Sequence, residues 1–221
     1  MNAENETSRP LALEQREQSA DKRLHSPSAA RNKDAIRDVL KTLLPTTGRV
    51  IEIGCGTGEH SVHFAAVFPE LDWLPSDPDA QSRDSASAWI AHAGLANVRA
   101  PVNIDVREGA WGVEELAPFN AIVSLNMIHI APWAATLGLF AGAERLLASG
   151  GVLFLYGPFM RNGEHTAPSN AAFDVSLKTR DPSWGVRDVA DLERLAQSHG
   201  LALKSVTDMP ANNFALEFRK N

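Results

Sequence analysis

A run of alternate glycines after a short apolar segment constrains the fold of this 221-residue chain more than any other feature. The segment reads Arg49-Val-Ile-Glu-Ile-Gly-Cys-Gly-Thr-Gly58. Its apolar half predicts a buried strand, and the glycines predict a sharp turn into a helix. Glycine lets a ligand approach the backbone where a Cβ would obstruct it. The segment therefore predicts a ligand-binding turn in an α/β fold, formed by Gly54, Gly56 and Gly58.

Glu52 is the one charged residue between the apolar positions of this strand. Burying a carboxylate there is costly unless it meets hydrogen-bond donors or a cation. The pattern Glu-x-Gly-x-Gly-x-Gly resembles motif I of class I S-adenosylmethionine (SAM) methyltransferases. The resemblance implies that Glu52 lies near the cationic methionine end of SAM and that the glycines pack beside its sugar. A dinucleotide fingerprint would instead need glycine at position 59, where Glu59 is a poor seat for a pyrophosphate.

Composition narrows the function classes. With 44% hydrophobic residues the chain can form the core of one full α/β domain. No stretch approaches the ~20 continuous apolar residues of a membrane span, and the N-terminus lacks the apolar core of a secretion signal, so we expect a cytoplasmic protein without a membrane partner. A single cysteine, Cys55, excludes an intrachain disulfide and argues against a thiolate metal cluster. The net charge of -6 argues against nucleic acid.

The order of apolar patterns predicts the fold class. Residues 1–25 are polar without periodicity and predict a flexible tail, followed by one domain over 26–221. A helix that ends at Pro45 precedes alternating strands and helices, which imply a mainly parallel sheet with helices on both faces. The predicted strands are 49–53, 71–76, 98–104, 120–126, 151–157, 201–207 and 213–219, and the helices lie near 60–67, 79–93, 133–147 and 187–199.

The last two predicted strands are joined by a connection too short for a helical crossover, so they should pair as an antiparallel hairpin. This ending resembles the Rossmann-like class I methyltransferase fold, whose seven-stranded, mostly parallel sheet has an antiparallel C-terminal hairpin strand. Pro75, which cannot donate a ladder hydrogen bond, is acceptable because it lies where its strand ends.

Carboxylates follow the second and third predicted strands, where open α/β sheets bind ligands. Asp77 lies near the usual position of a carboxylate that grips ribose hydroxyls, with Asp79 as the alternative ligand. The alternative is that Asp77 caps the helix that begins near residue 79. In the methyltransferase resemblance Asp105 accepts the adenine amino group, with Val106 beside it as a cofactor contact. A surface role for Asp105 is the alternative.

Polar residues that end the fourth and fifth predicted strands are candidates for the catalytic side of the site. Asn126 and His129 are expected near the methyl group and its acceptor, with Asn126 also a cofactor contact. His129 can act as a base near neutral pH, or it can pack under the following helix. Tyr156 can line the acceptor pocket or pack as an apolar residue.

The segment 158–186 is rich in Gly, Pro, Asn and Asp and carries Phe159, Phe173 and Trp184. A long irregular segment in a compact domain is usually a functional lid or disordered. We therefore expect a packed, lid-like cover over the active site, with a satellite cluster of no catalytic role as the alternative.

Further segments are similar to the methyltransferase-like 26 family over residues 28–221. The resemblance implies a SAM-dependent enzyme without fixing its substrate. It also raises the possibility that Arg31, before the first helix, pairs with the cofactor carboxylate, a structural role being the alternative. The segments are Ala30-Arg-Asn-Lys-Asp34, Phe68-Pro69, Pro75-Ser-Asp77, Asn126-Met127, Tyr156-Gly-Pro158, Pro168-Ser-Asn170, Phe173-Asp174, Asp181-Pro-Ser-Trp-Gly-Val-Arg-Asp188 and Met209-Pro-Ala-Asn-Asn213.

The sequence therefore predicts a SAM-dependent methyltransferase that acts on a small-molecule acceptor without a metal. The sulfonium methyl is already electrophilic, so the protein needs to supply alignment, desolvation and in some cases a base. A catalytically inactive, methyltransferase-shaped binding or regulatory protein is the alternative, and an NAD-dependent oxidoreductase fits Glu59 and the C-terminal hairpin poorly.

Overall fold

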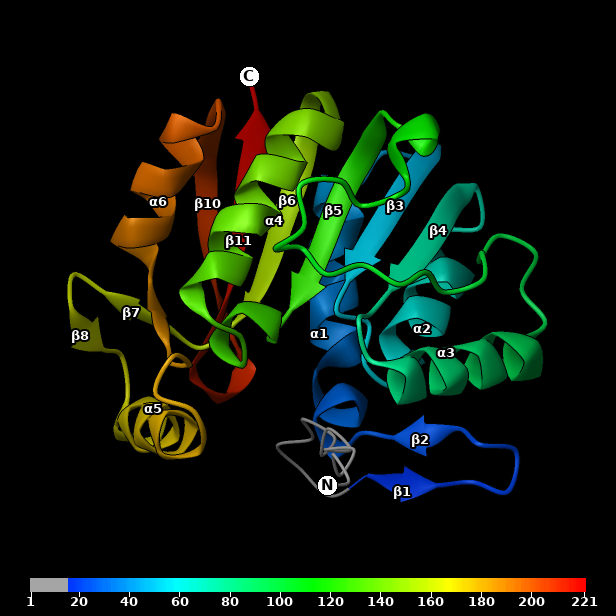
Figure 1. Ribbon diagram of the computed structural model, residues 1–221, viewed down its shortest axis with the longest axis horizontal. Coiled ribbons are helices and arrows are strands. Elements are labelled where there is room, and N and C mark those ends of the chain that lie inside the picture. Colours follow the sequence, from blue (N-terminus) through cyan, green and yellow to red (C-terminus); the bar gives the residue numbers. More distant parts are fainter. Residues whose placement is uncertain (1–15) are drawn as a thin grey trace, which may run out of the picture.

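A central mixed sheet organises the protein, which we describe from a computed structural model over residues 16–221 (Figure 1). Six strands lie in the order β10-β11-β6-β5-β3-β4. These strands are β3 (Gly48–Ile53), β4 (Leu71–Ser76), β5 (Phe119–Leu125), β6 (Leu147–Gly157), β10 (Leu201–Met209) and β11 (Asn213–Lys220). The helices are α1 (Pro27–Leu43), α2 (Glu59–Val67), α3 (Ala80–Ala93), α4 (Trp133–Leu146), α5 (Pro168–Arg180) and α6 (Val189–Ser198).

Strand directions confirm the predicted fold class. β3 pairs in parallel with β4 and β5, and β5 pairs in parallel with β6. β11 lies between β6 and β10 and is antiparallel to both, which is the C-terminal hairpin that the short connection predicts. In Figure 1 the parallel strands point downward, so the lower edge of the sheet carries their carboxyl ends. The short 3-10 helices are η1 (Glu114–Leu116), η2 (Met127–His129) and η3 (Pro210–Asn212).

The strand predicted over 98–104 is only partly formed, so the predicted strand count is roughly right. This segment reaches β4 through two isolated parallel bridges, Trp73 to Val98 and Ser76 to Val102. The physical cause is proline. The Pro75 carbonyl in β4 accepts a hydrogen bond from the Val102 N–H at 3.1 Å, but Pro75 has no N–H to donate to the segment 98–104. Pro101 in that segment also has no N–H to donate to β4.

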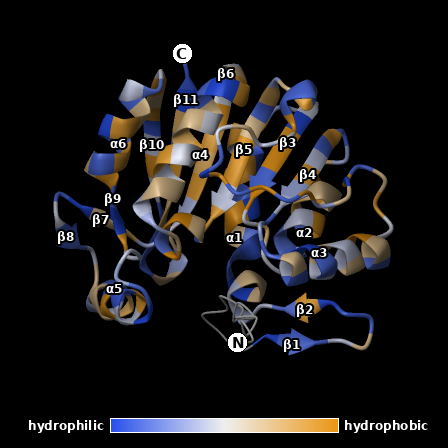
Figure 2. Ribbon diagram, viewed as in Figure 1, coloured by the Kyte–Doolittle hydropathy of each residue, from blue (hydrophilic) through white to orange (hydrophobic). Residues whose placement is uncertain are grey.

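The strands of the central sheet are largely hydrophobic (Figure 2). Their side chains alternate between the two faces and build one hydrophobic core on each. On β3, Ile51 packs into the core under α4 and α6, and Val50 packs into the core under α1 and α2. Helices therefore cover both faces, and Glu52 points its side chain toward the α2 face. No helix within residues 16–221 is long and apolar enough to cross a membrane.

An N-terminal hairpin corrects part of the predicted flexible tail. Residues 1–15 of that tail lie outside the described residues, but β1 (Glu17–Gln18) and β2 (Leu24–His25) pair as antiparallel strands. Leu24 is buried, its N–H donates to Ser85 Oγ at 2.9 Å, and its carbonyl accepts from Trp89 Nε1 at 2.9 Å. The hairpin is thus docked on α3, below the carboxyl edge of the sheet in Figure 1.

The segment 158–186 is more regular than its composition predicts. It contains β7 (Phe159–Arg161), β8 (Glu164–His165) and α5, and β7 also pairs with β9 (Arg187–Asp188). Leu177, Trp184 and Val186 form a small separate cluster of buried residues. Asp174 connects α5 to this cluster, because its carboxylate accepts from the Val186 N–H at 2.8 Å. The same carboxylate also accepts from Lys178 Nζ of α5 at 2.6 Å.

Candidate functional site

The glycine turn between β3 and α2 has the geometry that its sequence predicts. Gly54, Gly56 and Gly58 have φ values of 73°, 56° and 87°, a region that L residues with a Cβ rarely adopt. A Cβ on Gly58 would lie 2.5 Å from the Cα of Ala86, so α3 packs directly against the turn. The turn therefore presents bare backbone at the carboxyl edge of the sheet.

Asp77, which follows β4, is joined to this turn. Its Oδ2 accepts from the Gly56 N–H at 3.0 Å and its Oδ1 accepts from the Asp79 N–H at 2.9 Å. Asp79, and not Asp77, is the N-cap of α3, because the Asp79 carboxylate accepts from the Ser82 N–H at 2.7 Å. Burial raises the pKa of Asp77 above its ordinary value, and the two backbone bonds oppose that rise. The structure thus assigns the capping role, open in the sequence, to Asp79.

Glu52 is buried beneath the turn, with 1% of its surface exposed. Its Oε2 accepts from Ser61 Oγ at 2.6 Å and from Trp73 Nε1 at 2.9 Å. Burial raises the pKa of this carboxyl from 4.5 to about 7, with the charge of Asp77 adding to the rise and the two hydrogen bonds opposing it. Near neutral pH, Glu52 therefore exchanges between a neutral and a negatively charged form.

Replacing Glu52 by glutamine is expected to remove a pH dependence of stability. Because the folded-state pKa lies above 4.5, the folded state holds the proton more tightly, so the free energy of unfolding falls as pH rises from about 4.5 to about 7. The loss in the wild type is on the order of 2–3 kcal/mol. Urea unfolding of both proteins at pH 5 and pH 8 measures it, and parallel losses in the two would contradict the assignment to Glu52.

Asp105 and Val106 lie in the loop after the partial seventh strand. The Asp105 carboxylate accepts from Arg107 Nε at 2.9 Å and from the Arg107 backbone N–H at 3.0 Å, and this pairing lowers its pKa below the ordinary value. Val106 is buried in the core under α4, and its carbonyl lies against Gly138 of that helix. Their assignment to adenine stays a prediction.

Asn126 and His129, which follow β5, both lie beside Gly157 at the end of β6. A Cβ on Gly157 would lie 3.1 Å from Asn126 Oδ1 and would overlap His129 Nε2. His129 is 1% exposed, and neither of its ring nitrogens has a hydrogen-bond partner in the described part of the chain. Burial, helped by the charge of Arg187, lowers the pKa of His129 to about 3. The imidazole is therefore neutral at pH 7 and packs edge-on against Phe159.

Tyr156 packs into the core on the face of the sheet that α1 and α2 cover. It belongs to a group of polar side chains that the sequence predicted only in part. Burial raises the pKa of Tyr156, and the side chains of Asn32 and Asn213 and the charge of Arg31 oppose the rise. Asn32 Oδ1 in turn accepts from His60 Nε2 at 2.8 Å. The exposed Arg31, predicted to precede the first helix and to face the cofactor, lies instead within α1, beside this group. His60 was not predicted, although its place in the first turn of α2 is a signal.

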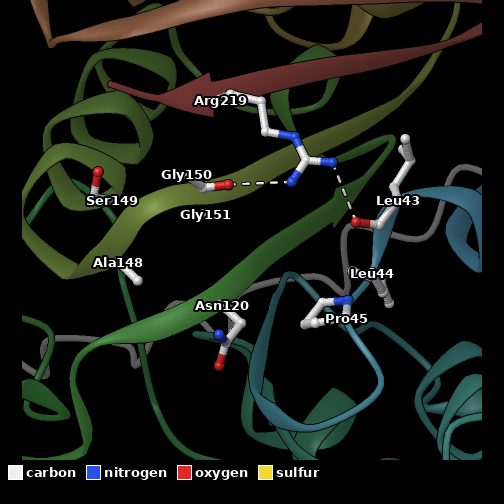
Figure 3. Close-up of a pocket in the computed structure, with 9 residues that line it drawn as sticks. All are labelled: Leu43, Leu44, Pro45, Asn120, Ala148, Ser149, Gly150, Gly151 and Arg219. Carbon is white, nitrogen blue, oxygen red and sulfur yellow. Dashed lines mark hydrogen bonds between the residues drawn. The ribbon is translucent and has the colours of Figure 1, made fainter.

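A cavity of about 300 Å³ lies at the opposite edge of the sheet, between the amino ends of β5 and β6 and the end of α1 (Figure 3). Polar groups there bind one another. Arg219 donates to the carbonyls of Gly150 at 3.1 Å and Leu43 at 3.2 Å, and Asn120 Oδ1 accepts from the Arg49 N–H. Open α/β sheets bind ligands at the carboxyl ends of their strands. We therefore interpret this cavity as a packing gap between α1 and β11 and not as a ligand site.

Solved structures with the same arrangement are methyltransferases. The chain is similar to a putative O-methyltransferase from Nostoc punctiforme PCC 73102, with a TM-score of 0.75, 17% identity, and coverage of 88% of this chain and 57% of that chain. It is similar to the SAM-dependent methyltransferase SibL in its apo form, with a TM-score of 0.71, 20% identity, and 87% and 55% coverage. A third is CalO1, a methyltransferase in calicheamicin biosynthesis, in its SAH-bound form, with a TM-score of 0.69, 17% identity, and 88% and 54% coverage.

These likenesses establish a class I methyltransferase fold. The chain spans little more than half the length of the three solved structures. A family sequence model with the description "Protein of unknown function (DUF938)" matches residues 23–220, so the chain belongs to the DUF938 family.

Proposed function

We propose that the protein is a SAM-dependent methyltransferase that transfers a methyl group to a small-molecule acceptor. One observation carries the proposal. Asp77 is bonded to the Gly56 N–H within a Glu-x-Gly-x-Gly-x-Gly turn at the carboxyl edge of a class I methyltransferase sheet. The solved structures with this fold include a SAM-dependent enzyme and an SAH-bound one.

The residues around the turn fit the cofactor chemically. The turn offers bare backbone, Asp77 offers a carboxylate for ribose hydroxyls, and the buried Glu52 would place a negative charge beneath a positively charged methionine end. Asp105 and the Val106 backbone would face the adenine, and Arg31 would pair with the cofactor carboxylate. When bound, SAM supplies an electrophilic methyl group, so the protein's task is to align the acceptor and exclude water.

Asn126 and Tyr156 are proposed to line the acceptor side from different faces of the sheet, because Asn126 follows β5 and Tyr156 lies next to the end of the adjacent strand β6. The raised pKa of Tyr156 keeps the phenol protonated at neutral pH, so it can donate a hydrogen bond to an acceptor oxygen or nitrogen. The neutral imidazole of His129 can accept a proton, but it lies behind the Gly157 backbone. A base at this position would therefore need a shift of that backbone to reach a substrate.

Other features support finer parts of the proposal. Segments that are similar to the methyltransferase-like 26 family meet in space, since Asn170 Nδ2 of one donates to the Asn212 carbonyl of another at 2.8 Å. The β7–β9 sheet and α5 would form the cover of the acceptor site. The acidic net charge supports a small-molecule acceptor over nucleic acid, and we propose a cytoplasmic location.

Titration calorimetry with SAM, S-adenosylhomocysteine and NAD tests the proposal directly. We expect binding of both adenosyl compounds and no binding of NAD, because Glu59 follows the turn where a pyrophosphate would need glycine. Tight NAD binding without SAM binding would overturn the assignment. Incubation of a metabolite extract with methyl-labelled SAM then identifies the acceptor, and binding without methyl transfer to any metabolite would favour an inactive, methyltransferase-shaped binding protein.

A further inference from the structure

Arg16 lies beside the glycine turn, although it belongs to a part of the sequence that predicts a tail. It directly precedes β1 of the N-terminal hairpin. Its Nη2 lies 3.7 Å from the point that a Cβ on Gly56 would occupy. The Gly56 N–H is also the group that donates to Asp77. A guanidinium and a carboxylate therefore flank the same bare stretch of backbone.

The hairpin that carries Arg16 is tied to the glycine turn itself. Ser85 Oγ accepts from the Leu24 N–H at 2.9 Å and donates to the Thr57 carbonyl at 2.7 Å. One serine hydroxyl thus links the hairpin to the turn. Glu59, the first residue of α2, adds a second link by accepting from the Ser26 N–H at 2.6 Å. Arg16 is therefore placed by a docked element.

The Arg16 side chain also has a donor without an acceptor. Its Nε is buried and makes no hydrogen bond within residues 16–221. Buried donors in proteins are rarely left unpaired, and a charged donor least of all. A ligand oxygen above Gly56 would meet Nη2 of the same guanidinium. The charge of Arg16 also helps to keep the buried Asp77 ionised.

We propose that Arg16 is a sugar-binding residue of the nucleoside site, donating to the ribose hydroxyl oxygens whose O–H groups donate to Asp77. A hydroxyl both donates and accepts, whereas a carboxylate only accepts and a guanidinium only donates. Together the two side chains complement a vicinal diol. This inference rests on the proposed function, because it takes the ligand to be an adenosine derivative, and it adds a contact that precedes the family match at residue 23.

Calorimetry on the full chain with two probes tests this role. S-adenosylhomocysteine carries both an adenosine and an amino-acid end, whereas 5′-methylthioadenosine carries the adenosine without the amino-acid end. Arg16→Ala is expected to weaken both by the same factor of about tenfold, which is the effect of one charge-assisted hydrogen bond, and Arg16→Lys should restore part of the affinity. The matched control is Arg23→Ala on the same hairpin, whose guanidinium lies 4.7 Å from the Trp89 ring centroid, and both affinities should stay within about twofold.

Hydrogen exchange gives a second readout that needs no turnover. Amides of residues 17–25 should gain protection when 5′-methylthioadenosine binds the wild type, and this gain should shrink in Arg16→Ala. Three results overturn the proposal: weaker binding of S-adenosylhomocysteine alone, which would place Arg16 at the carboxylate; tighter binding, which would make Arg16 an obstruction; and no change in either affinity. If the wild type binds neither probe, the proposed function itself fails.

Discussion

Replacing Asp77 by alanine is expected to weaken the binding of S-adenosylhomocysteine by roughly 100-fold. Two hydrogen bonds from ribose hydroxyls to an ionised carboxylate contribute about 1.5–3 kcal/mol each, and 1.4 kcal/mol is a factor of ten in affinity. The same change leaves the Gly56 N–H without its acceptor, so the variant should also lose on the order of 1–2 kcal/mol of folding free energy. Calorimetry and urea unfolding measure the two effects separately.

Asp79→Ala is the matched control for this variant, because the two carboxylates lie two residues apart. Asp79 caps α3, so its loss should cost about 1 kcal/mol of stability, as for other N-caps. Its effect on nucleoside affinity should stay below about threefold. The opposite pattern, with affinity lost in Asp79→Ala and kept in Asp77→Ala, would make Asp79 the sugar ligand and Asp77 a purely structural residue.

The sheet could be predicted well because its strands are continuous apolar runs between turn residues. The predicted strand 71–76 coincides with β4, and the short connection after Asp208 predicted the antiparallel hairpin of β10 and β11. The partial seventh strand was the weak point. Pro75 and Pro101 each lack a donor, and their combined effect depends on which residues meet between the two segments, which the sequence does not reveal.

The N-terminal hairpin and α5 could not be predicted from local pattern. The hydrogen bonds that dock the hairpin join Leu24 to Ser85 and Trp89, which are 61 and 65 positions further along the chain. The residues of the hairpin are mostly polar. In α5 only one pair of large apolar residues, Phe173 and Leu177, has the four-residue spacing of a helix face, so Gly- and Pro-rich neighbours dominated the prediction of an irregular segment. Pro168 in the first turn and basic residues in the last turn were the available helix signals.

The candidate site likewise contains residues that local sequence patterns predict and residues that only packing brings together. Asp77 and the glycines were predictable because the turn and the next strand are adjacent in sequence and fixed in the sheet. The bond between His60 and Asn32 joins two helices 28 residues apart, so it depends on how α1 crosses α2. Arg16 depends on the docking of the hairpin. Sequence patterns thus predicted the geometry of the glycine turn better than the contacts contributed by docked or crossing elements.

The structure also separates two kinds of constraint on the glycine turn. Gly56 faces space that Arg16 approaches at 3.7 Å, so a side chain there would compete with a ligand. Gly58 faces the backbone of α3, so a side chain there would push the helix away. Because α3 begins at the Asp79 cap, two residues after Asp77, movement of this helix should displace the carboxylate that bonds to the turn. Packing at Gly58 thereby supports the geometry at Asp77.

Gly58→Ala is accordingly expected to cost about 3–4 kcal/mol of folding free energy, the sum of left-handed strain and overpacking. The residue has a φ of 87°, and the new Cβ would lie 2.5 Å from the Ala86 Cα and 2.7 Å from its Cβ. Gly94→Ala is the matched control, because its φ is 64° and a Cβ there would meet nothing within 4 Å. That variant should lose only the backbone strain, about 1–2 kcal/mol. Urea unfolding of both gives the comparison, and equal losses would mean that contact with α3 adds nothing to the constraint on Gly58.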